Sequence, residues 1–177
     1  MIEIDGSLGE GGGQVLRSSL TLAVMTGQKM RIANIRAHRK NPGLSHQHLA
    51  AVKAAAEICD ARVVGRELGS SELEFSPNEI CSGQYNFNIS TAGSTSLVLQ
   101  TVILPLSRAK GSSTVTVTGG THVSWSPCYH YLDLNYLPFL WKMGLDVHLR
   151  MEQPLRYPSW SSPLLPMDGS VDTSMPM

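Results

Sequence analysis

Charge is scarce in this sequence. Only 16% of the 177 residues are charged, and 14 basic residues balance 14 acidic ones, so the formal net charge at pH 7 is zero. Ordinary globular domains carry roughly 25% charged residues. A chain without excess positive charge does not bind nucleic acid through bulk electrostatic attraction. Any polyanionic ligand must therefore be bound by a local cluster of cations.

Long apolar runs and paired cysteines are also missing. No apolar run approaches the ~18 residues of a membrane span, and the stretch MIEID at 1–5 lacks the basic and apolar regions of a secretory signal. Cys59, Cys81 and Cys128 are far apart and form no CxxC pair. This spacing favours free thiols in a reducing cytoplasm over disulfides or a zinc site. We expect a cytoplasmic protein with no membrane contact.

The first half of the chain is predicted to alternate strands and helices. Ile2 and Ile4 alternate with polar neighbours, a glycine-rich stretch follows, and apolar residues from Val15 to Val24 recur at helical spacing. Gly27 ends that helix. The next predicted elements are a strand near 30–34, a helix over 45–59 that begins at Ser45, and strands near 62–65 and 72–75.

The same pattern then starts again. The predicted elements are a strand near 85–89, a helix over 97–106, a strand over 114–118, a helix that follows Pro127 and runs through Trp141, and a strand at 147–149. A shift of 85 positions lays Ile4 on Ile89, Ile32 on Val117 and Pro42 on Pro127. Agreement at a single offset predicts an α/β fold of two repeated units, over 1–80 and 81–151. Residues 152–177 hold five of the ten prolines and no hydrophobic period, so we expect a disordered or unrelated tail there.

The stretch GEGGGQ at 9–14 lies between a predicted strand and a predicted helix. Exposed N–H groups at a helix start favour anions. The stretch is neither a Walker A loop nor a dinucleotide fingerprint, because no Gly-Lys-Ser/Thr follows and Gln14 replaces the third glycine. Glu10 either serves a metal or is solvated, and Arg17 lies one turn into the helix.

The cluster RAHRK at 36–40 concentrates basic groups after a predicted strand, where guanidinium groups suit phosphate oxygens. The alternative is a solvated charge run. His46 and His48 cannot share one helical face, which argues against a His–His metal pair. Gln100 lies in an apolar helix, so its amide is either satisfied in the core or contacts a ligand.

Together these blocks resemble the RNA 3′-terminal phosphate cyclase family. The resemblance covers roughly the first 150 residues and is most specific at GEGGGQVLR (9–17), IRAHR (35–39), PGL (42–44), QHL (47–49), AGS (92–94) and GGT (119–121). It implies repeated βαβαββ units, as in enolpyruvate transferases. It also implies ATP-dependent conversion of an RNA 3′-phosphate to a 2′,3′-cyclic phosphodiester through enzyme-adenylate and RNA-adenylate intermediates.

The resemblance also implies roles for individual residues. Glu10 would hold a divalent metal, Mg or Mn, beside the ATP phosphates. The residues that would bind nucleotide or phosphate are Arg17, Arg36, Arg39, Gln47, His48, Gln100 and Pro127. The implied partners are ATP and an RNA with a 3′-phosphate end. We also expect homo-oligomers, because the absence of the remainder of a family-sized protein would expose apolar surface.

Departures from the family pattern limit these expectations. Family chains are about twice this length, and their nucleophilic histidine lies in the C-terminal part. None of the six histidines here matches it, so we assign no catalytic residue and expect this chain alone to be inactive. The stretch RYPSWSS at 156–162 replaces the family's Tyr-Pro followed by glycines. The tail is a frameshift, a truncation or a natural end.

Two other functions compete with the cyclase hypothesis. A non-catalytic, cyclase-like scaffold protein of ribosome biogenesis would tend to lack the acidic glycine loop and its arginine, whereas Glu10 and Arg17 are both present. A carboxyvinyl-transferase relative is built from a similar repeated unit. The blocks that contain Arg36, Arg39, Gln47 and His48 do not suit it.

Overall fold

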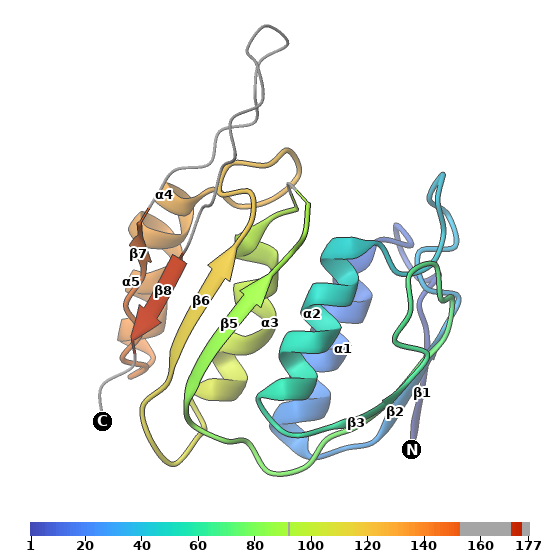
Figure 1. The fold of residues 1–177 in the computed structure, drawn as a ribbon, viewed down its shortest axis with the longest axis horizontal. Helices are drawn as coiled ribbons and strands as arrows, with labels where there is room; N and C mark the ends of the chain where they lie inside the picture. The colour runs from blue at the N-terminus through green and yellow to red at the C-terminus, as the bar shows by residue number, and fades with distance from the viewer. Residues whose placement is uncertain (92, 153–170, 175–177) are drawn as a thin grey trace, which may run out of the picture.

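The computed structural model describes residues 1–91, 93–152 and the backbone of 171–174 (Figure 1). The chain forms two units with the same order of elements. The elements of the first unit are β1 (Ile2–Asp5), α1 (Gly13–Thr26), β2 (Met30–Ala33), α2 (His46–Glu57), β3 (Arg62–Val64) and β4 (Leu73–Ser76). Gly27 ends α1 in the left-handed conformation, as the sequence predicts.

The second unit follows the same βαβαββ order, with a helical stretch of three parts in place of α2. Its elements are β5 (Gln84–Asn88), α3 (Thr95–Leu106), β6 (Thr114–Thr118), α4 (Tyr129–Tyr131), η1 (Leu132–Tyr136), α5 (Leu137–Lys142), β7 (Arg150–Met151) and β8 (Val171–Ser174). The π-helical turn η1 precedes Pro138, which has no N–H to donate to the preceding turn. No helix in the described part of the chain is long and apolar enough to span a membrane.

The two sheets have the same topology, which confirms the predicted repeat. Their strand orders are β1-β2-β4-β3 and β5-β6-β8-β7, and in each sheet the first pair is parallel and the other pairs are antiparallel. The predicted offset of 85 residues between the two units does not hold for their first strands, β1 and β5. Ile4 pairs with Ile32, whereas Phe87 pairs with Val117, so Phe87 and not Ile89 is the counterpart of Ile4.

The structure corrects two predictions near the end of the chain. The strand expected at 147–149 begins later in the structure, as β7 (Arg150–Met151), and the carbonyls of Val147 and Leu149 instead accept hydrogen bonds from Trp141 Nε1 and the Tyr129 hydroxyl. The tail predicted to be disordered over 152–177 contributes β8, which completes the second sheet, so the second unit extends past the predicted boundary at 151. Residues 153–170 and 175–177 lie outside the described residues.

Helices α1, α2 and α3 lie between the two sheets (Figure 1). Their apolar side chains join both sheets in one buried cluster, which includes Leu20, Val52, Phe75, Val102 and Val117. The predicted inward stripe of α1 is confirmed, because Leu16, Leu20 and Val24 are buried. The Thr21 hydroxyl donates a hydrogen bond to the carbonyl of Thr101, which links α1 of the first unit to α3 of the second.

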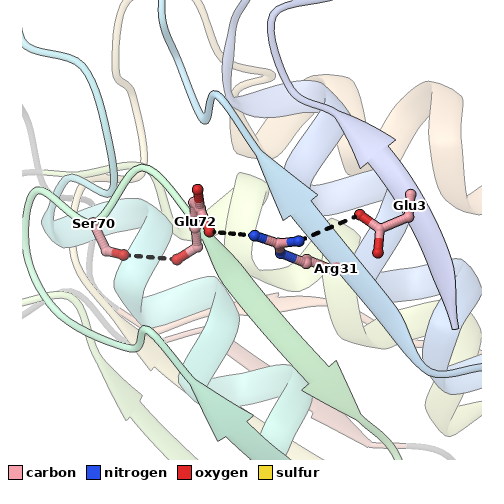
Figure 2. Close-up of polar contacts among 4 residues, drawn as sticks. All are labelled: Glu3, Arg31, Ser70 and Glu72. Atoms are coloured by element: carbon pink, nitrogen blue, oxygen red, sulfur yellow. Dashed lines mark hydrogen bonds and ion pairs between the residues drawn. The ribbon is translucent and has the colours of Figure 1, made fainter.

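The outer face of the first sheet carries charge. Arg31 on β2 contacts Glu3 of β1 at 3.9 Å and Glu72 at 2.9 Å, and the Ser70 hydroxyl donates to the carbonyl of Glu72 (Figure 2). Alternation along β2 buries Met30 and Ile32 on the opposite face, against the helices. The first sheet is therefore apolar on the side that packs against the helices and charged on the other side.

Candidate functional site

The site is a cavity of about 810 Å³ where helices α1 and α2 begin. In each case the helix follows a parallel strand, so the carboxyl ends of β1 and β2 lie at the same edge of the sheet (Figure 1). Crevices at this edge are the usual ligand sites of open α/β sheets. The cavity brings together six of the predicted site residues, which are Glu10, Arg17, Arg36, Arg39, Gln47 and His48.

Arg17 is a buried cation in the wall of this cavity. The residue is 7% exposed, and one guanidinium nitrogen, Nη2, donates to Gln14 Oε1 at 3.0 Å. Its Nε is buried without a hydrogen-bond partner, and no ion pair in the described part of the chain includes Arg17. Burial lowers the pKa of Arg17 to about 10, so the side chain is still charged at neutral pH. A buried, unpaired guanidinium favours an anionic ligand.

His48 lies beside Arg17 and is neutral. Ser45 is the N-cap residue of α2, as predicted, but its hydroxyl does not cap the helix backbone and instead shares a hydrogen bond of 2.5 Å with Nδ1 of His48. Burial, together with the nearby charges of Arg36 and Arg17, lowers the pKa of His48 to about 3. A neutral imidazole can donate or accept one proton, so His48 can form a hydrogen bond with a ligand without adding charge.

The basic loop after β2 supplies two more guanidinium groups. Arg36 has a positive φ of 56°, which non-glycine residues rarely adopt, and its Nη1 donates to the carbonyl of Gly43 at 2.8 Å. Burial and the neighbouring charge of Arg39 lower the pKa of Arg36. Arg39 is half-exposed and reaches Glu10 at 3.7 Å. Thus Arg36 is fixed in the wall, whereas Arg39 lies nearer the mouth.

Gln47 connects the cavity to the second unit. Its Oε1 accepts a hydrogen bond of 2.8 Å from the backbone N–H of Ser94, the residue before α3. Ser94, Thr95 and Ser96 are all buried at this junction. The amide of Gln47 therefore holds the start of α3 against the start of α2, which makes the wall continuous between the units. Ala92, part of the predicted AGS turn, lies outside the described residues.

Glu10 is the predicted metal ligand, and its surroundings restrict the kind of metal site that it can form. Its side chain is 93% exposed in the glycine loop. Among the described residues, no group of three or more His, Cys, Asp or Glu side chains could hold a metal ion. Magnesium sites often use one or two carboxylates together with phosphate oxygens of the substrate. Glu10 fits this shared arrangement and does not form a site made of protein ligands alone.

Two predicted site residues lie outside the main cavity. Gln100 lines a neighbouring cavity of about 250 Å³, which shares Gln14 and Arg17 with the main one. The Oε1 of Gln100 is buried without a partner, so its amide is not satisfied in the core. Pro127 does not line the cavity, but its carbonyl accepts a hydrogen bond from the Ser96 hydroxyl at 2.7 Å.

Some lining residues of the cavity lie outside the sequence blocks that predicted the site, among them Leu8, Leu97, Ser124, Trp125 and Ser126. The last three belong to the loop after β6, in the position that the basic loop occupies in the first unit. The sequence feature that could have pointed to Trp125 is that this loop contains an aromatic residue. The site as a whole can bind a phosphate-bearing ligand through buried cations and helix starts.

The fold and cavity define an α/β protein of two βαβαββ units with a cationic pocket at the strand ends. Residues 8–159 match the family described as RNA 3′-terminal phosphate cyclase, and the chain belongs to this family. The thiols agree with the sequence analysis, since Cys59, Cys81 and Cys128 are all free.

Curated relatives support this assignment. The RNA 3′-terminal phosphate cyclase of Nostoc punctiforme is 53% identical over 158 residues, which are 85% of this chain and 45% of the relative. The protein of the same name from Methylococcus capsulatus is 48% identical over 165 residues, which are 89% of this chain and 46% of the relative. That from Methanothermobacter thermautotrophicus is 48% identical over 158 residues. The chain spans about half the length of the curated relatives it matches.

Proposed function

We propose that this chain forms the phosphate- and nucleotide-binding part of an ATP-dependent RNA 3′-terminal phosphate cyclase. In the proposed reaction AMP is transferred from ATP to the enzyme with release of pyrophosphate, and then from the enzyme to the RNA 3′-phosphate. Attack by the neighbouring 2′-hydroxyl, which loses its proton, then forms the 2′,3′-cyclic phosphodiester and releases AMP. Phosphoryl and nucleotidyl transfer depend mainly on positioned cations and a metal. The residues of the cavity supply the cations.

The observation that carries this proposal is the state of Arg17. Its guanidinium is buried in the cavity wall, has an unpartnered Nε and faces no carboxylate among the described ion pairs. Charge-assisted hydrogen bonds from a guanidinium to phosphate oxygens would satisfy these donors. Arg36 and Arg39 from the basic loop line the same cavity, so the ligand would meet three cations, one from helix α1 and two from the basic loop.

A divalent metal is part of the proposed function. Glu10 would hold it together with phosphate oxygens of ATP, and the bound metal would neutralise charge on the transferring phosphate. The Glu10–Arg39 contact of 3.7 Å is loose and exposed, so it costs little to separate the two side chains. The chain's own contribution is then to position the phosphates between the glycine loop and the arginines.

The binding part of this proposal can be tested with a short RNA that carries a 5′ fluorophore and either a 3′-phosphate or a 3′-hydroxyl. Fluorescence anisotropy should show tighter binding of the 3′-phosphate form. Arg17→Met should remove that preference, with a loss of about 10- to 100-fold, since hydrogen bonds to charged groups contribute ~1.5–3 kcal/mol.

The matched control is Arg66→Met, which removes an exposed arginine that does not line the cavity. This variant should keep the preference of the wild type. Equal affinity of the wild-type chain for both RNA ends would contradict the proposal.

A further inference from the structure

Trp125 is an exposed aromatic side chain at the edge of the cationic cavity. It lines the cavity together with Ser124 and Ser126, yet it is fully exposed to solvent. Its backbone has a positive φ of 63°, a conformation that costs free energy for a bulky residue. Single exposed apolar residues are common on protein surfaces. An exposed indole on a strained backbone, lining the same cavity as a buried arginine, needs a more specific explanation.

The loop that carries Trp125 is anchored at both ends. At its start, the carbonyl of Gly120 accepts hydrogen bonds from the Thr95 N–H at 2.9 Å and from the Thr95 hydroxyl at 3.2 Å. At its end, the carbonyl of Pro127 accepts a hydrogen bond of 2.7 Å from the Ser96 hydroxyl. Both anchors lie in the first turn of α3. The indole is therefore presented by a braced loop rather than by a loose one.

The anchors also connect Trp125 to the phosphate-binding wall. The residue before Thr95, Ser94, donates its N–H to Gln47, and Gln47 lines the same cavity as Arg17 and Trp125. One chain of hydrogen bonds thus joins the start of α2, the start of α3 and the loop after β6. A ligand whose phosphate contacts Arg17 would extend toward this loop if it leaves the cavity on the side of the second unit.

We propose that Trp125 is a stacking platform for a nucleobase of the RNA, next to the 3′-phosphate that the cavity binds. This inference rests on the proposed function and identifies a further contact of the same site. Aromatic side chains on which bases stack, beside a cationic groove, are the common means of binding single-stranded nucleic acid. An open position suits an RNA strand that continues into solvent, whereas a small ligand such as ATP is usually enclosed on most sides.

The experiment compares three probes on the wild-type chain, Trp125→Ala and Trp125→Phe. The probes are a short RNA with a 3′-phosphate, the same RNA with an abasic terminal nucleotide, and ATP. Trp125→Ala should weaken binding of the intact RNA by about fivefold or more, since stacking of one base contributes at least about that factor. The variant should bind the abasic RNA and ATP like the wild type. Trp125→Phe should retain most of the affinity for intact RNA.

Each other result overturns the inference. An unchanged affinity of Trp125→Ala for intact RNA would exclude the platform, and an equal loss with abasic RNA would exclude stacking. A loss of affinity confined to ATP would mean that the adenine base of ATP, and not an RNA base, stacks on Trp125. Failure of the proposed function is visible separately, because the wild-type chain would then show no preference for the 3′-phosphate. The control Trp141→Phe changes an indole on α5 that does not line the cavity, and it should bind RNA normally.

Discussion

Arg17 and His48 meet at Gly13, the first residue of α1. A Cβ added to Gly13 would collide with Nε2 of His48 and would lie 2.9 Å from Nη1 of Arg17. Both side chains are buried there, and both line the cavity. The absence of a side chain at position 13 therefore allows the cation and the neutral imidazole to reach the same part of the wall.

Gly13→Ala should disrupt the site through this contact. Alanine is a better helix former than glycine, so the substitution does not weaken the helix itself. The collision should nevertheless displace His48 or Arg17 and weaken binding of inorganic pyrophosphate by about tenfold or more. Isothermal titration calorimetry would measure the change. Gly83→Ala is the control, because its Cβ would make only ordinary contacts of 3.7 Å with Tyr85. Full pyrophosphate affinity in Gly13→Ala would show that the glycine is not required.

Arg17→Met should stabilise the chain in the absence of ligand. A buried, unpaired guanidinium is unfavourable, as its pKa of about 10 reflects, and a flexible apolar side chain removes that cost. We expect the free energy of unfolding to rise by about 1–3 kcal/mol, measured by urea denaturation. Added pyrophosphate should stabilise the wild type and not Arg17→Met. A destabilised variant would mean that Arg17 supports the fold rather than the ligand.

The neutral state of His48 should make the fold sensitive to acid. The folded chain holds the pKa of His48 at about 3, whereas in the unfolded chain it is near 6.5. The unfolded state therefore binds a proton first as the pH falls below about 6.5, and stability is lost in the window between 6.5 and 3. From pH 7 to pH 5 this group alone should cost about 2 kcal/mol.

Urea denaturation at the two pH values would measure this loss. His48→Gln should reduce the difference in the free energy of unfolding between pH 7 and pH 5 by about 2 kcal/mol. The matched control is His46→Gln, an exposed side chain at the start of the same helix, which should leave the difference as in the wild type. An identical pH dependence of wild type and His48→Gln would contradict the prediction.

Much of the site could be predicted from short sequence blocks, because the glycine loop, the basic loop and the start of α2 all follow parallel strands. The pairing of the strands could not be predicted to the residue. Ile89 and Phe87 are two positions apart, so both satisfy the same inward alternation when aligned with Ile4. Strand β8 was missed because it is short, lacks an apolar period and depends on pairing with the distant β6.

The burial, hydrogen-bond partners and backbone angles of the site residues could not be predicted from the sequence. The sequence places Arg17 one turn into a helix but does not reveal that its Nε is buried without a partner. The sequence equally gives no sign that Arg36 and Trp125 have positive φ angles, because these depend on how their loops close. The residue types predicted an anionic ligand. Which donors are left without a partner and how the loops hold the side chains depend on burial and loop geometry, which only the structure shows.

The helical stretch after β6 should promote self-association. Leu134, Phe139 and Met143 are 70%, 64% and 71% exposed, and Phe139 and Met143 are one helical turn apart. Exposed apolar surface of this kind drives association. We expect light scattering to show oligomers of the wild-type chain, and Phe139→Glu with Met143→Lys should shift it toward monomer. Leu68→Lys, which changes an exposed residue in the first unit, should not. A wild-type monomer at all concentrations would contradict this prediction.

Covalent adenylation of this chain would require a nucleophile within reach of the α-phosphate of ATP. All six histidines lie in the described part of the chain, and among them only His48 lines the cavity. Its Nδ1 forms a hydrogen bond with the Ser45 hydroxyl, and neither it nor any other histidine here matches the nucleophilic histidine that the family resemblance implies. We therefore expect no labelled band when the chain is incubated with α-labelled ATP and a divalent metal and then run on a denaturing gel. An ATP-dependent DNA ligase in a parallel lane is the positive control. A band on this chain that His48→Ala abolishes would identify His48 as a nucleophile and overturn the assignment of a purely binding role.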